Sequence, residues 1–92
     1  TINQKIPFNT DCSYHLYWIL VKNRDYFIKK MSENNVEVGI HYKPIHKLDY
    51  YKTRINLPVT NRIENHIVSI PMHPNLSEDD VSRIISMVNK YA

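Results

Sequence analysis

The pattern of apolar and polar residues predicts three β-strands in this chain of 92 residues. The first lies in 14–21, where aromatic and branched side chains fill nearly every position, which predicts a strand covered on both faces. The second is 36–42, in which apolar residues alternate with Glu, Gly and His. The third is 66–70. Pro44 and Pro71 end the last two strands because proline cannot donate a hydrogen bond to a sheet.

Capping residues predict where the helices lie. Asn23 suits the N-cap of a first helix, and the asparagine pair at 34–35 ends it because Asn tolerates the left-handed conformation. A short helix is expected over 60–65, capped by its first or second residue. The last helix begins after Ser77, which forms a capping box with Asp80 and precedes an apolar stripe.

This order of elements predicts an α+β fold, a two-layer sandwich of a three-stranded, mainly antiparallel sheet with helices on one face. Residues 12–92 would form one domain after a lead-in segment, 1–11. The apolar first strand predicts that the uncovered face packs on another domain or subunit, unless the N-terminal segment folds over it. The chain opens on Thr1 instead of Met, which fits either part of a longer protein or N-terminal processing.

Composition excludes several classes of function. A single Gly excludes Gly-rich phosphate loops, and a single Cys excludes a disulfide framework and Cys-rich zinc sites. The five histidines lack the spacing of metal ligands, so no metal site is expected, and His15 is expected in the core because apolar residues flank it. Apolar runs are too short to cross a membrane and no secretion signal is present, which predicts a cytoplasmic protein without a membrane partner.

The formal charge of +3 is concentrated in residues 41–54, where basic residues face a single acid, Asp49. These basic residues are Lys43, Lys47, Lys52 and Arg54. Aromatic and imidazole rings are interleaved with them, namely His41, Tyr42, His46, Tyr50 and Tyr51. Cations beside aromatic rings suit a phosphate-bearing ligand with a ring to stack, either a nucleotide-linked small molecule or single-stranded nucleic acid. A solvated loop with locally packed tyrosines is the third interpretation.

Several short motifs follow one another in a characteristic order. They are Ser-Tyr-His-Leu-Tyr at 13–17, Gly-Ile-His-Tyr at 39–42, Pro-Ile-His at 44–46, Tyr-Tyr at 50–51 and Val-Ser-Ile-Pro at 68–71, with Arg24 between the first two and Pro74, Leu76 and Asp80 after the last. From about residue 12 to the end, this pattern resembles the C-terminal small domain of the DegT/StrS family of sugar aminotransferases, which use pyridoxal phosphate.

The resemblance implies an enzyme of fold type I that transfers an amino group, usually from glutamate, to the keto carbon of a nucleotide-linked sugar. It implies that pyridoxal phosphate is bound mainly by a large domain, which supplies the lysine that bonds it. No lysine of this chain has that setting, so the chain alone is expected to be inactive. The resemblance also implies a homodimer. Some members of the family lack the lysine and are dehydratases, so the reaction of the parent protein stays open.

By the same resemblance, His41, Tyr42 and His46 lie near the substrate or the partner subunit. His41 and His46 would hold the sugar or pyrophosphate, and Tyr42 would line the pocket. The cations expected to contact the phosphates are Lys43, Lys47 and Arg54. Two alternatives stay open: a module that binds a nucleotide or single-stranded nucleic acid through 41–54, and a structural dimerisation domain.

Overall fold

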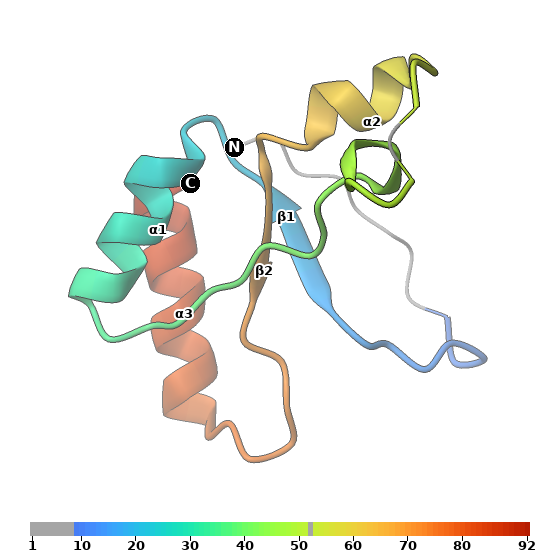
Figure 1. Cartoon of the computed structure of the whole chain (residues 1–92). Coiled ribbons are helices and arrows are strands. Elements are labelled where there is room, and N and C mark those ends of the chain that lie inside the picture. The colour runs from blue at the N-terminus through green and yellow to red at the C-terminus, as the bar shows by residue number, and fades with distance from the viewer. Residues whose placement is uncertain (1–8, 52) are drawn as a thin grey trace.

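The computed structural model describes residues 9–51 and 53–92, which form an α+β fold (Figure 1). Its elements in chain order are β1 (Tyr17–Leu20), α1 (Arg24–Glu33), the short 3₁₀ helix η1 (Ile45–Lys47), α2 (Pro58–Ile63), β2 (Ile67–Ile70) and α3 (Glu78–Tyr91). Helices α1 and α3 contact each other and lie on one side of the sheet, whereas η1 and α2 lie on the other side (Figure 1).

The sheet has two antiparallel strands, β1 and β2, with Tyr17 opposite Ile70 and Leu20 opposite Ile67. The predicted first and third strands are thus confirmed, although β1 is shorter than 14–21. Tyr14 and Tyr17, at the start of that range, are exposed.

The predicted second strand, 36–42, is wrong as a strand of the sheet. In the described chain this segment pairs with β2 at one residue, where Gly39 and Ser69 exchange both backbone hydrogen bonds, at 2.9 and 2.8 Å. Beyond that pair the segment crosses β2 on its way from α1 to η1 instead of running along it (Figure 1). The alternating pattern therefore indicated an extended segment, but not a ladder of hydrogen bonds.

The hydrophobic core lies between the sheet and the two long helices. Its buried members are Ile19, Val21, Phe27, Met31, Val36, Val68 and Ile84. Burial of these side chains is the main favourable contribution to folding, at about 25 cal/mol for each Å² of apolar surface removed from water. Of the α3 stripe, Ile84 is buried, whereas Val81 and Ile85 remain exposed.

The opposite face of the sheet is closed at its centre. Leu20 and Ser69 point to that face and are only 6% and 4% exposed. The expectation of an uncovered face is therefore wrong at these positions. Residues 1–8, most of the predicted lead-in segment, lie outside the described residues. His15, expected in the core, is exposed because β1 begins two residues after it.

Both predicted ends of α1 are confirmed. The side chain of Asn23 accepts a hydrogen bond from the Tyr26 backbone N–H at 3.1 Å, which satisfies a donor that the first helical turn leaves free. Asn35 adopts a left-handed conformation with φ of 59°, and the next N–H, of Val36, donates to the Met31 carbonyl at 2.9 Å. Asparagine and glycine tolerate this conformation best, so the chain turns sharply out of the helix here.

Helix α2 begins earlier than predicted. Its first residue is Pro58, and proline is favoured at this position because its missing N–H would be unpaired there and its φ already suits a helix. Asn61, expected near the N-cap, is therefore in the second half of the helix, and its side chain is free for another contact.

The capping box of α3 is confirmed. The Ser77 hydroxyl accepts from the Asp80 N–H at 3.0 Å, and the Asp80 carboxylate accepts from the Ser77 N–H at 3.0 Å. The hydrogen bond from the Ser77 backbone lowers the pKa of Asp80. The ionised Asp80 carboxylate therefore stabilises the folded chain at a pH above its unfolded-state pKa. This stabilisation is lost as the pH falls through the lowered folded-state pKa.

We predict that Ser77→Ala lowers the free energy of unfolding by about 1 kcal/mol, because the first turn of α3 loses its cap. Urea unfolding measures the change. Ser82→Ala, an exposed position inside the same helix, is the matched control and should be neutral or slightly stabilising. Equal effects of the two substitutions would contradict the capping role.

Candidate functional site

A shallow hollow of about 330 Å³ lies between η1, α2 and the loop that joins them. It is lined by His46, Lys47, Thr53, Arg54, Ile55, Asn56 and Asn61. Its lining combines amide and hydroxyl groups with an imidazole and two cations. Such groups suit a ligand that carries hydroxyl groups and a phosphate.

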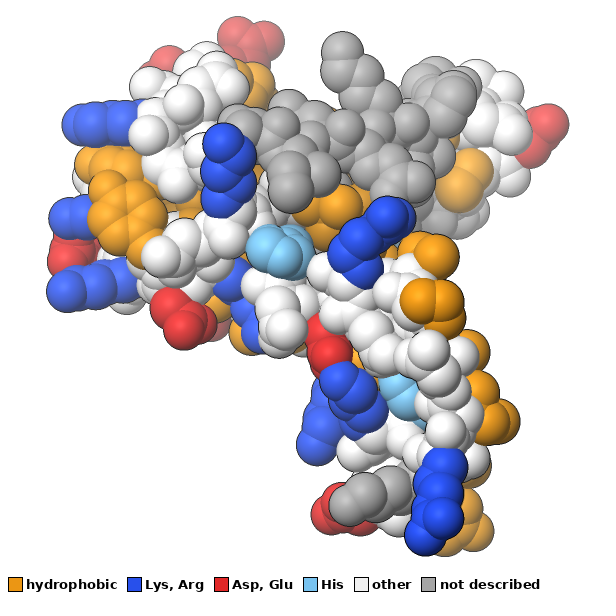
Figure 2. Space-filling model, turned by 90° about the horizontal axis from the view of Figure 1, so that it is seen from above, with side chains coloured by type: hydrophobic (Ala, Val, Ile, Leu, Met, Phe, Trp, Pro, Cys, Tyr) orange, Lys and Arg blue, Asp and Glu red, His pale blue; other side chains and the backbone are white. Residues whose placement is uncertain are grey.

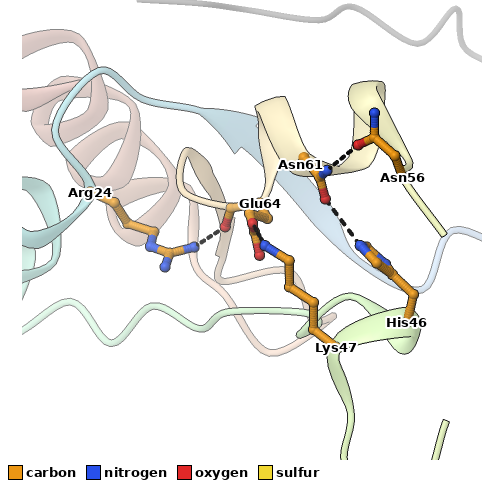
Figure 3. Close-up of polar contacts among 6 residues, drawn as sticks. All are labelled: Arg24, His46, Lys47, Asn56, Asn61 and Glu64. Atoms are coloured by element: carbon orange, nitrogen blue, oxygen red, sulfur yellow. Dashed lines mark hydrogen bonds and ion pairs between the residues drawn. The ribbon is translucent and has the colours of Figure 1, made fainter. Parts of the chain in front are cut away.

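A chain of hydrogen bonds fixes the His46 ring at the wall of this hollow (Figure 3). The Asn61 amide nitrogen donates to Asn56 Oδ1 at 3.0 Å, which turns Asn61 Oδ1 toward His46. His46 Nε2 lies 3.0 Å from that oxygen and therefore donates to it. The ring is only 8% exposed, and its buried Nδ1 has no partner among the described residues. Neutral His46 thus carries its proton on Nε2, and Nδ1 is an acceptor.

Glu64, just after α2, connects three parts of the chain (Figure 3). Its carboxylate forms an ion pair with Lys47 of η1, and its backbone carbonyl accepts a hydrogen bond from the Arg24 guanidinium at the start of α1. These contacts fix the position of η1 and of the end of α2 relative to helix α1. They also neutralise the Lys47 ammonium, whereas Arg54 lines the hollow with no ion pair among the described residues.

The structure gathers three of the six predicted binding residues around the hollow, namely His46, Lys47 and Arg54. The other three, His41, Tyr42 and Lys43, lie on the segment that leads into η1 and do not line it. Tyr42 is 65% exposed, and its ring meets the edge of the His41 ring at a centroid distance of 4.8 Å.

The part of the chain around η1 and α2 projects from the core and bears basic, histidine and apolar side chains (Figure 2). Tyr50 and Tyr51 on this loop contact each other edge to face and are exposed. Lys52, another residue of the predicted basic segment, lies outside the described residues.

Sequence reasoning missed Thr53, Asn56 and Asn61 as lining residues, and Glu64 as the residue that connects η1 to α2. One signal was present for Asn61. Asparagine is a poor helix former away from the caps. Once Pro58 is taken as the first helical residue, Asn61 lies inside the helix, which suggests that its side chain makes a contact elsewhere. No comparable pattern marked Glu64, because its partners are 17 and 40 residues away along the chain.

Other charged groups lie away from the hollow. On α1, the hydrogen bond and charge of Glu33 raise the pKa of Lys30, whose ammonium is 3.0 Å from that carboxylate. Within the described residues, no group of three or more His, Cys, Asp or Glu side chains is placed to hold a metal ion. No helix in 9–51 or 53–92 has both the length and the apolar character needed to span a membrane.

The lining of the hollow does not fit pyridoxal phosphate. A pyridoxal site needs a lysine to bond the cofactor and an acidic side chain beside the pyridine nitrogen. Among the described residues that line the hollow, the lysine is Lys47, which is paired with Glu64, and none is acidic. The arrangement can bind oxygen-rich groups, but it does not hold this cofactor.

Comparisons with known proteins agree with this architecture. A family model, "DegT/DnrJ/EryC1/StrS aminotransferase family", matches residues 2–89. The chain is 33% identical over 81 residues to a dTDP-3-amino-3,6-dideoxy-alpha-D-galactopyranose transaminase of Aneurinibacillus thermoaerophilus, covering 85% of this chain and 22% of that protein. It is 31% identical over 77 residues to a UDP-4-amino-4-deoxy-L-arabinose--oxoglutarate aminotransferase of Shewanella sediminis (strain HAW-EB3), covering 74% and 20%.

Solved structures show the same fold. A DegT DnrJ EryC1 StrS aminotransferase from Brucella abortus superposes with a TM-score of 0.73 at 32% identity, over 82% of this chain and 21% of that one. The sugar aminotransferase CalS13 from Micromonospora echinospora gives a TM-score of 0.75 at 21% identity over the same shares, which supports the fold alone.

The small α+β fold and the histidine-lined hollow therefore occur in a chain related to aminotransferases. This chain belongs to the DegT/DnrJ/EryC1/StrS aminotransferase family. It spans about a fifth of the length of the relatives that it matches.

We predict that Asn61→Ala lowers the free energy of unfolding by about 1–3 kcal/mol, because the His46 Nε2–H loses its buried acceptor. Urea unfolding measures the loss. Asn65→Ala, an exposed position just beyond α2, is the control and should change stability little. If both variants unfold at the same urea concentration, Asn61 does not hold His46.

Proposed function

We propose that this chain is the C-terminal small domain of a sugar aminotransferase that transfers an amino group, from glutamate, to the keto carbon of a nucleotide-linked sugar. The observation that carries the proposal is its 33% identity, over 85% of its length, to a transaminase named for a dTDP-linked amino sugar. The second relative is named for a UDP-linked amino sugar. Both names describe a sugar bearing an amino group on a nucleotide diphosphate.

The chemistry of the hollow supports this substrate class. Sugar hydroxyl groups both donate and accept hydrogen bonds, which suits the side chains of Thr53 and Asn56, and the Asn61 amide that His46 holds at the wall of the hollow. A pyrophosphate requires a cation, and the Arg54 guanidinium is suited to bind two phosphate oxygens at once. Lys47 would contribute less because Glu64 already neutralises it.

The segment before η1 is proposed to complete the substrate site. His41 would contact the sugar or pyrophosphate, the exposed Tyr42 ring would lie against the substrate, and Lys43 would add positive charge. Pyridoxal phosphate would be held mainly by a large domain outside this chain, with the parent acting as a cytoplasmic homodimer. The nucleic-acid alternative is not favoured, because the family match covers 2–89, including the whole basic segment.

We predict that His46→Ala in the full-length enzyme raises the KM for the nucleotide sugar by about tenfold, because the buried ring that holds the Asn61 side chain at the wall of the hollow is lost. Steady-state kinetics with varied nucleotide sugar measure this change. The matched control is His73→Ala, an exposed histidine in the loop before α3, which should leave the KM unchanged. Unchanged turnover and sugar affinity in the His46 variant would contradict the binding role.

We predict that Arg54→Ala weakens nucleotide-sugar binding by about tenfold or more, because a charge-assisted hydrogen bond to phosphate is lost. Lys47→Ala should have a smaller effect on binding, since its ammonium is occupied by Glu64. Titration calorimetry with the nucleotide diphosphate alone compares the two variants. A larger loss from the Lys47 substitution would reverse this assignment.

A further inference from the structure

Besides His46 Nδ1, two polar atoms at the pairing of β2 with the 36–42 segment are buried without a hydrogen-bond partner among the described residues. They are the hydroxyl oxygen of Ser69 and Nδ1 of His41. Ser69 is 4% exposed, so water cannot readily compensate its hydroxyl. A buried polar atom that stays unpaired costs about 1–3 kcal/mol, which makes two such atoms on one face a feature that needs an explanation.

The backbone places these two side chains on the same face. Ser69 and Gly39 are directly opposite each other and exchange both backbone hydrogen bonds, so substituents on the two residues project to the same side. His41 is two residues beyond Gly39 in an extended segment and therefore returns to that side. Its ring lies over Gly39, on the side to which the Ser69 side chain points.

Gly39 makes this position of the His41 ring possible. A Cβ atom built on Gly39 would lie 2.6 Å from His41 Cε1, closer than Cβ atoms approach other atoms in proteins, and 3.2 Å from its Nδ1. The imidazole thus occupies the space that any other residue at position 39 would fill with its side chain. This explains a glycine in an extended segment, where it otherwise weakens the structure.

We propose that Ser69 is a positioning residue for His41 and that Gly39 provides the space in which the ring is held. When a ligand settles the ring, the Ser69 hydroxyl turns about its Cα–Cβ bond and donates to His41 Nδ1. His41 then carries its proton on Nε2 and presents that nitrogen as a donor to an oxygen of the nucleotide sugar. This inference rests on the proposed binding role of His41 and adds the residues that set its tautomer.

A double-mutant cycle in the full-length enzyme tests the proposal, with the KM for the nucleotide sugar as the measurement. We expect His41→Leu to raise this KM by about tenfold and Ser69→Ala by about fivefold, the size of one hydrogen bond. In the His41→Leu background, the further substitution Ser69→Ala should change the KM by less than about twofold, because it acts through His41. Ser82→Ala on the exposed side of α3 should have no effect.

Gly39→Ala provides a second route that leaves both polar groups in place. Its methyl group should displace the His41 ring and raise the KM for the nucleotide sugar about as much as His41→Leu, with little further change when the two are combined. Thermal unfolding of each variant checks that the enzyme is folded. If Ser69→Ala does not fold, Ser69→Cys takes its place in the cycle, because it removes the hydroxyl with little change in size, whereas the Gly39 variants test only the position of the His41 ring.

The outcomes separate the two proposals. If His41→Leu raises the KM but Ser69→Ala leaves it unchanged, or raises it equally in both backgrounds, the positioning role is overturned and the binding role of His41 stands. Likewise, if Gly39→Ala leaves the KM unchanged, or raises it equally with and without His41→Leu, the role of Gly39 in making space for the ring is overturned. If His41→Leu leaves the KM unchanged, the proposed binding role of His41 is overturned, and the positioning role with it.

Discussion

The antiparallel pairing of β2 with β1, and of Ser69 in β2 with Gly39, is the constraint on which the rest of the structure depends. Successive side chains of a strand point to opposite faces. Val68 therefore enters the core beneath α1 and α3, while Ser69 points to the face that also carries His41. One strand of four residues thus both anchors the hydrophobic core and orients the candidate site. A shift of register by one residue would bury Ser69 in the core and turn Val68 toward the site.

Helix α2 and the residue after it hold the projecting loop in position relative to the core. The loop contributes little to the core, because its apolar side chains are largely exposed. Its position depends instead on polar contacts: Asn61 with His46, and Glu64 with both Lys47 and Arg24. Exposed ion pairs contribute little stability, but the buried His46–Asn61 bond is costly to break because it would leave a donor unpaired. The direction of His46 therefore depends on a helix of six residues.

The chain belongs to the aminotransferase family, and the lining of its hollow has the chemistry that suits oxygen-rich groups but no acidic side chain for pyridoxal phosphate. In the proposed function, this chain supplies substrate recognition and the cofactor lies elsewhere in the parent protein. That division agrees with the chain spanning about a fifth of its relatives' length. It also accounts for a lining of amides, imidazole and guanidinium around a lysine that is already neutralised.

Local physical chemistry made much of this protein predictable from its sequence. Residues within a few positions of one another determine four features that are present in the structure. These are the helix caps at Asn23 and Ser77, the left-handed Asn35, and strand β2. The motifs at 39–42, 44–46 and 68–71 likewise identified the family. Tertiary structure alone decided that 36–42 pairs with β2 at one residue, that Glu64 holds Lys47, and that Asn61 orients His46. These contacts join residues 15 to 30 positions apart, and no periodic pattern records which distant side chains a fold brings together.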